Sequence, residues 1–180
     1  MILFIALALI WALIRGYRPS KAFREISLLP LAVLEIVFWY FQACAWTGNY
    51  SYIRYASHLQ MLYILALIWP ILKFALYDKA IVGAIMVAIG SFMNKAVMNA
   101  NGGKMPVYPT LSKLTGYYTG GALEASGDAR HMLMTGATQL GFLGDYIDVG
   151  FSIMSPGDVL MHGFVTLVVY GVIRELNRKG

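Results

Sequence analysis

Residues 26–46 read ISLLPLAVLEIVFWYFQACAW, and Glu35 is the one charged residue among them. An α-helix needs about 20 mainly apolar residues to cross the hydrocarbon core of a bilayer. The length and composition of this stretch therefore predict a transmembrane helix. Its aromatic end, which includes Trp39 and Trp46, is typical of a segment that enters the membrane interface.

Four more apolar runs flank this stretch, one before it and three after it. We expect them to span the membrane at about residues 1–16, 58–77, 80–98 and 156–176. Pro70 predicts a kink in the 58–77 helix, because proline lacks a backbone donor. Small residues let transmembrane helices approach closely, and four glycines offer such contacts: Gly83, Gly90, Gly163 and Gly171. The predicted fold is all-α, with residues 1–180 forming one membrane domain, a polytopic helical bundle of about five spans.

The composition favours a membrane protein over a soluble one. Hydrophobic residues make up 59% of the 180-residue chain and charged residues only 13%, whereas a soluble domain carries about 25% charged residues. The net charge of +5 sits in short tracts between apolar runs, without the basic face of a nucleic-acid-binding protein. We expect the lipid bilayer, and no nucleic acid, as a partner. The lone cysteine, Cys44, excludes an internal disulfide and a C-x-x-C site.

Lysine and arginine residues predict the orientation of the chain, because short cytoplasmic loops are enriched in them. Most of them lie in three short tracts, which are Arg15, Arg18, Lys21 and Arg24; Lys73 and Lys79; and Arg174, Arg178 and Lys179. With these tracts in the cytoplasm, the N-terminus lies outside, the C-terminus lies inside, and the number of spans is odd.

The segment before the last span, residues 99–155, then forms a long outer loop on the non-cytoplasmic side. A loop of this length is commonly functional or carries structure of its own. Within it, four polar residues recur at helical spacing, namely His131, Thr135, Thr138 and Gln139. We therefore predict a short helix at residues 129–143, which lies on the membrane surface or re-enters the protein.

Two aspartates near the end of this loop, Asp145 and Asp158, are the candidate catalytic residues of a hydrolase. Carboxylates held close can divide acid and base roles, because both cannot easily be ionised together. The spacing also predicts a structural role for Asp158. Ser155 fits a helix N-cap, Pro156 fits the first helical position and Asp158 fits the third, which together form a capping box. The two roles are not exclusive.

The candidate binding residues of the 99–155 loop are Asn101, Lys104, His131 and Asp148. The glycine turn after Asn101, beside Lys104, exposes backbone N–H groups that suit an anion or a carboxylate. A helix C-cap explains the same glycines. The histidines show none of the spacings typical of metalloenzymes, so we predict no metal site, and the sequence leaves any cofactor unknown.

Glu35, in the 26–46 span, and His162, in the last span, are candidate residues within the membrane. An ionisable group at membrane depth is costly and is a functional hypothesis by default. Glu35 is either protonated or paired with a residue such as His162. A structural hydrogen bond and a proton or ion relay both remain open.

Three motifs carry a resemblance to a known family: NGGKMPV at residues 101–107, LGD at 143–145 and SPGDVL at 155–160. In their order and spacing they resemble a family of uncharacterised small bacterial membrane proteins, known only as a domain of unknown function. The resemblance covers most of the chain. It implies a multi-pass protein of the bacterial cytoplasmic (inner) membrane and supplies no activity.

A second, local resemblance links residues 145–158 to lipoprotein signal peptidase (signal peptidase II), which pairs two aspartates near the outer membrane surface. It implies Asp145 or Asp148, together with Asp158, as the dyad, and Asn101 as a contact to the substrate backbone. The Asn-Asp-Arg motif of that family is absent here. Ser-Pro-Gly also stands where that family has Phe-Asn-x-Ala.

The sequence contains no complete catalytic motif, and its predicted spans carry few charges. Our leading hypothesis is therefore a non-catalytic protein that uses the 99–155 loop. It would be an accessory subunit of a membrane complex, with partner subunits, or a small solute- or ion-binding protein. The alternatives are a membrane-embedded aspartyl hydrolase or peptidase using Asp145 and Asp158, and a small transporter using Glu35 and His162.

Overall fold

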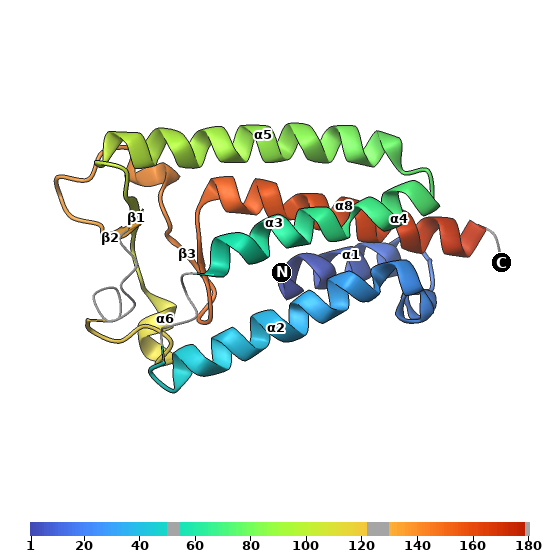
Figure 1. Cartoon of the computed structure of the whole chain (residues 1–180), viewed down its shortest axis with the longest axis horizontal. Coiled ribbons are helices and arrows are strands. Elements are labelled where there is room, and N and C mark those ends of the chain that lie inside the picture. Colours follow the sequence, from blue (N-terminus) through green and yellow to red (C-terminus); the bar gives the residue numbers. More distant parts are fainter. Residues whose placement is uncertain (50–54, 122–129, 179–180) are drawn as a thin grey trace. The chain divides into compact units, whose positions relative to one another are not determined.

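The computed structural model describes residues 1–49, 55–121 and 130–178, and most of these residues lie in helices. The chain divides into two compact units. Unit 1 comprises Met1–Phe38, Ser57–Val87 and His162–Gly180, and unit 2 comprises Trp39–Ala56 and Ala88–Met161. Three long helices contribute residues to both units, namely α2 (Leu29–Trp46), α5 (Tyr77–Ala100) and α8 (Pro156–Arg178). Figure 1 labels these helices.

Three helical stretches are long and apolar enough to cross a membrane: Ile26–Trp46, Tyr77–Ala100 and Pro156–Arg178. They coincide with the predicted spans at 26–46, 80–98 and 156–176. The other two predicted spans coincide with shorter apolar helices, Ile2–Ile14 and Met61–Lys73. The mainly helical fold is thus confirmed, and three of the five expected spans have the length that crossing requires.

Unit 1 is packed around the C-terminal part of α8. The ring of Trp11, in α1 (Ile2–Ile14), stacks on Tyr170 with 4.2 Å between ring centroids. A Cβ atom at Gly83 of α5 would lie 1.8 Å from the ring of Phe164. Only glycine fits there, so the helices approach closely at this point, as the sequence predicted.

The predicted kink at Pro70 is a break between two helices. α3 (Ala56–Ala66) ends before Leu67 and α4 (Ile68–Lys73) begins after it. Pro70 has no N–H to donate to the carbonyl four residues earlier, so the helix loses a hydrogen bond at this break.

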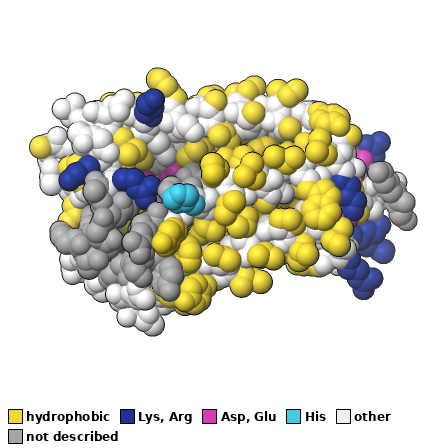
Figure 2. Space-filling model, viewed as in Figure 1, with side chains coloured by type: hydrophobic (Ala, Val, Ile, Leu, Met, Phe, Trp, Pro, Cys, Tyr) yellow, Lys and Arg dark blue, Asp and Glu magenta, His cyan; other side chains and the backbone are white. Residues whose placement is uncertain are grey.

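The basic side chains of unit 1 gather at one end of it (Figure 2). The backbone N–H of Arg18 donates to Oδ1 of Asn177 at 3.0 Å, and Nζ of Lys21 donates to the carbonyl of Leu176 at 3.1 Å. Lys73 forms an ion pair with Glu25. The three basic tracts of the sequence therefore meet within unit 1, apart from Lys179, which lies outside the described residues.

Unit 2 contains short strands in the 99–155 loop (Figure 1). Here β1 (Met105–Val107) pairs in parallel with β2 (His131–Leu133), and β3 (Ile147–Asp148) pairs antiparallel with β4 (Ile153–Met154). The short helix α6 (Leu111–Leu114) lies between β1 and β2, and the 3₁₀ turn η4 (Gly141–Leu143) lies between β2 and β3 in the chain.

The helix predicted at residues 129–143 is wrong for the described part of that stretch, residues 130–143. It forms β2, a turn at Thr135 and Thr138, and η4 instead. The N–H of Met134 donates to the carbonyl of Val107 at 2.9 Å. A strand distant in sequence thus takes the backbone hydrogen bonds that a helix would form within itself. Residue 129 lies outside the described residues.

Candidate functional site

Asp145 lies just after η4 and is fixed by the backbone of β1. Its N–H donates to the carbonyl of Pro106 at 2.8 Å, and its carbonyl accepts from the N–H of Tyr108 at 2.7 Å. The opposite edge of β1 pairs with β2, where Met105 lies in register with His131. Strand β1 therefore holds Asp145 at one edge and His131 at the other.

The carboxyl group of Asp145 is buried, and the residue is 6% exposed. Its Oδ1 has no hydrogen-bond partner in the described part of the chain, and its Oδ2 lies 3.7 Å from Nε2 of His131. Burial disfavours the charged carboxylate, and the negative charge of Asp158 adds to this effect. Together they raise the pKa of Asp145 to about 8. Both effects favour the protonated form of the Asp145 carboxyl.

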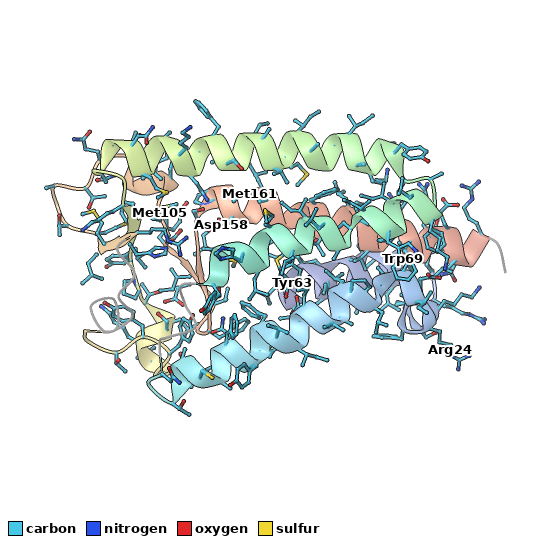
Figure 3. The ribbon with its side chains drawn as sticks, in the orientation of Figure 1. Arg24, Tyr63, Trp69, Met105, Asp158 and Met161 are labelled. Carbon is cyan, nitrogen blue, oxygen red and sulfur yellow. The ribbon has the colours of Figure 1, made fainter. Side chains whose placement is uncertain are left out.

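Asp158 lies in the first turn of α8 (Figure 3) and forms the predicted capping box. The N–H of Asp158 donates to Oγ of Ser155 at 2.9 Å, and the N–H of Ser155 donates to Oδ2 of Asp158 at 3.1 Å. The other carboxylate oxygen, Oδ1, accepts from the side-chain amide of Asn94 at 2.9 Å. The capping interpretation of Asp158 is therefore confirmed.

A close helix crossing brings Asn94 to Asp158. A Cβ atom at Gly90 of α5 would lie 2.4 Å from the carbonyl oxygen of Gly157, and one at Gly157 would lie 2.1 Å from Oδ1 of Asn94. The hydroxyl of Ser155 also donates to Oδ1 of Asn94 at 2.8 Å. Sequence reasoning missed Asn94 as a site residue. The sequence feature that could have identified Asn94 is its place one helical turn after Gly90, as a polar side chain in an apolar helix.

Asp148 holds two segments of the 99–155 loop together. Its Oδ2 accepts from the backbone N–H groups of Thr110 and Ser112 at 2.7 and 2.9 Å, and from Oγ of Ser112 at 2.7 Å. Its Oδ1 accepts from the N–H of Gly150 at 2.9 Å. Burial alone would raise the pKa of Asp148, but these donors outweigh burial and lower it. Every one of these contacts is structural, so Asp148 is an anchor of the loop.

Asn101 and Lys104 lie in the turn that ends α5. The side chain of Asn101 donates to the carbonyl of Gln139 at 2.8 Å and accepts from the N–H of Gln139 at 3.0 Å. Gly102 has a left-handed φ of 65°, and the N–H of Gly103 donates to the carbonyl of Met98 at 2.8 Å. The turn is therefore the C-cap that the sequence allowed. Lys104 is exposed beside it.

Glu35 and His162 lie in unit 1. Glu35 is 7% exposed, and its Oε1 accepts from the hydroxyl of Tyr63 at 3.0 Å and lies 3.6 Å from the amino group of Met1. The ring of His162 packs edge-on against Phe4, with ring centroids 5.3 Å apart. Glu35 thus makes the structural hydrogen bond that the sequence left open. A relay through Glu35 and His162 stays a prediction.

The family is decided by a match along most of the chain. Residues 20–170 match a family model described as a family of unknown function, DUF5317. The chain belongs to the DUF5317 family. It is 30% identical, over 106 residues, to a protein from Thermotoga maritima named "Uncharacterized protein". That similarity covers 56% of this chain and 57% of the relative, so the chain spans a little over half the length of that protein. No solved structure matches the chain.

The DUF5317 match contains all the candidate residues of unit 2. Of these, Asp145 lies within electrostatic range of Asp158 and 3.7 Å from His131. Asp148 binds the start of α6, Asn101 binds Gln139, and Lys104 lies exposed in the turn after α5. Across residues 1–49, 55–121 and 130–178, no group of three or more His, Cys, Asp or Glu side chains is placed to hold a metal ion. The site therefore brings together the carboxyl groups of Asp145 and Asp158 and the imidazole of His131.

Proposed function

We propose that the chain is a multi-pass protein of the bacterial inner membrane with five spans, its N-terminus outside and its C-terminus inside. The meeting of the three basic tracts within unit 1 supports this orientation, because cytoplasmic ends are rich in Lys and Arg. Cysteine substitutions at Arg178 and Lys113, in a Cys44→Ser background, test it. A membrane-impermeant thiol reagent should label position 113 in intact spheroplasts and position 178 only after lysis. The reverse pattern would overturn the orientation.

We further propose that the 99–155 loop and the start of α8 form an aspartyl acid–base site that hydrolyses an amide bond at the membrane surface. The observation that carries this proposal is the buried carboxyl of Asp145, which lies within electrostatic range of Asp158. Two carboxyl groups whose surroundings differ in this way can act as acid and base in one reaction. Perturbed groups of this kind are concentrated at functional sites.

The roles follow from the two environments. Asp158 takes a proton from the attacking water, whose oxygen bonds to the carbonyl carbon of the substrate. Asp145 donates its proton to the amide nitrogen as the C–N bond breaks, so the amine leaves neutral. Afterwards Asp158 loses its proton to solvent and Asp145 regains one, which restores the site.

Two isosteric substitutions test the proposal, Asp145→Asn and Asp158→Asn. The purified protein in detergent is incubated with a library of peptides, and cleavage products are read by mass spectrometry. We expect cleavage by the wild type and none by either variant. The hydrolase proposal fails if the wild type cleaves nothing, or if both variants still cleave.

Ser155→Ala is the matched control for a purely structural effect at Asp158. It removes the hydroxyl that caps the N–H of Asp158 and leaves both carboxyl groups in place. The expected loss of stability is about 1 kcal/mol, with cleavage retained. If Ser155→Ala loses cleavage as fully as Asp158→Asn while the protein stays folded, Asp158 acts through capping rather than as a base.

A non-catalytic role is the second candidate, and a specific observation favours it. Asn101, Asp148 and Asp158 all direct hydrogen bonds to the surrounding fold. A loop held in this way presents a fixed surface, which suits an accessory subunit or a solute-binding protein. Purification from native membranes distinguishes this candidate, because a co-purifying protein or solute supports it and a lone chain that cleaves peptides refutes it.

A further inference from the structure

The imidazole of His131 connects the buried carboxyl of Asp145 with solvent. The side chain of His131 is 32% exposed, whereas that of Asp145 is 8% exposed. Their closest atoms, Nε2 and Oδ2, are 3.7 Å apart. This is an ion-pair distance, slightly longer than a hydrogen bond, so a small movement of either side chain brings the two into hydrogen-bond contact.

The backbone fixes this juxtaposition. The N–H of Met105 donates to the carbonyl of Arg130 at 2.6 Å, and the N–H of Asp145 donates to the carbonyl of Pro106 at 2.8 Å. Neighbouring residues of β1 thus hold the segments of His131 and Asp145 at opposite edges. The pair forms because β1 lies between them, although 14 residues separate them in sequence.

A buried acid that gives up its proton in each reaction cycle must recover one from solvent. We propose that His131 is the group that exchanges protons between solvent and the carboxyl of Asp145. The use made of that proton rests on the proposed hydrolase function. In the recharging step, Nε2–H of the imidazolium gives its proton to Oδ2 of the Asp145 carboxylate. The neutral imidazole then takes the next proton from water.

Other groups around Asp145 do not offer this path. Asp158 of α8 faces it as a negative charge, and in the proposed reaction it is the base, which passes its own proton to solvent in each cycle. Asn94 of α5 carries a neutral amide, which does not exchange a proton at ordinary pH. His131 of β2 carries an imidazole whose Nε2 lies 3.7 Å from Oδ2 of Asp145, and an imidazole can both donate and accept a proton.

Infrared difference spectroscopy of the purified protein tests the coupling without any substrate. A protonated carboxylic acid has its own carbonyl stretching band, and the band of Asp145 is assigned by its loss in Asp145→Asn. The pH at which this band is half lost is then compared among the wild type, His131→Gln, His131→Arg and His58→Gln. His58 is an exposed histidine of α3 and serves as the matched control.

We expect His131→Gln to raise this midpoint, because it removes the group that can carry a positive charge beside the carboxylate. His131→Arg should lower the midpoint, and His58→Gln should leave it unchanged. An unchanged midpoint in both His131 variants refutes the inference and leaves the hydrolase proposal standing. Absence of the Asp145 band in the wild type at neutral pH refutes both. A midpoint that shifts with His131, in a protein that cleaves no peptide, supports the inference and refutes the hydrolase.

Discussion

Asp148→Asn is the substitution whose effect on the 99–155 loop can be worked out most directly. Helix α6 has four residues, and its N-cap, Thr110, makes no side-chain capping bond. Asp148 supplies that cap from a distant segment, since its Oδ2 accepts three bonds of 2.7–2.9 Å from Thr110 and Ser112. Asparagine keeps one acceptor oxygen and turns the other into an NH₂ donor. That donor must face N–H groups either at α6 or at Gly150.

The expected cost is about 2 kcal/mol, because a hydrogen bond to a charged group contributes roughly 1.5–3 kcal/mol. The pH dependence has a defined sign. The donors lower the pKa of Asp148 in the folded chain, so the stabilisation is present above the unfolded-state pKa of about 3.9. It is lost as pH falls further, through the folded-state pKa. The Asn variant should therefore differ from the wild type at neutral pH and converge with it in acid.

Hydrogen–deuterium exchange with mass spectrometry measures this effect in the intact protein. Peptides that cover residues 108–118 and 147–152 should exchange faster in Asp148→Asn, by roughly 30-fold for a 2 kcal/mol loss of local stability. Asp78→Asn is the matched control, because Asp78 is a carboxylate of unit 1 with a 63% exposed side chain. Equal exchange in the wild type and Asp148→Asn would refute the role of Asp148 as the anchor.

Three further predictions follow from individual contacts. Gly83→Ala should lower the free energy of unfolding by about 1–3 kcal/mol through overpacking against the buried ring of Phe164. Thermal unfolding in detergent measures this loss, and an unchanged unfolding midpoint would contradict the close approach of the two helices. Tyr63→Phe should cost about 1–3 kcal/mol by leaving a carboxylate oxygen of Glu35 without its donor, and an unfolding midpoint equal to that of the wild type would count against that hydrogen bond. Asp145 has a raised pKa, so the folded chain binds its proton more tightly, and wild-type stability should fall as pH rises from about 4 to about 8. Asp145→Asn should flatten that slope, and an equal slope in both proteins would show that the Asp145 carboxyl stays ionised.

The local features of the chain could be predicted from the sequence. Ser155, Pro156 and Asp158 form the capping box because its hydrogen bonds join residues three positions apart. The helix break at Leu67 follows in the same way from the missing N–H of Pro70, three residues later. The close approach at Gly83 was also predictable, because glycine in an apolar helix indicates a close packing contact.

The 99–155 loop could not be predicted, because distant segments determine it. The spacing of His131 and Thr135 is helical, but Met105–Val107 offers a strand edge to residues 131–133. No local pattern shows that this edge is available. Strand β1 also determines the position of Asp145, because its other edge holds the backbone of Asp145 through Pro106. The wrongly predicted helix at residues 129–143 and the unpredicted burial of Asp145 therefore have one cause, the strand β1.

The environment of Asp145 is difficult to explain by structure alone. A buried carboxyl group with an oxygen that lacks a partner among the described residues destabilises a fold, and an apolar side chain of similar size would avoid that cost. Asp148 and Asp158, by contrast, have their oxygens occupied by donors and stabilise the segments they join. Of the three carboxyl groups, Asp145 is thus the one whose chemistry is not already used by the fold. In the proposed reaction, the partly exposed His131 gives the Asp145 carboxyl access to protons from solvent. Asp158 is the base that complements Asp145 as the acid. A functional account of this chain should therefore begin at Asp145.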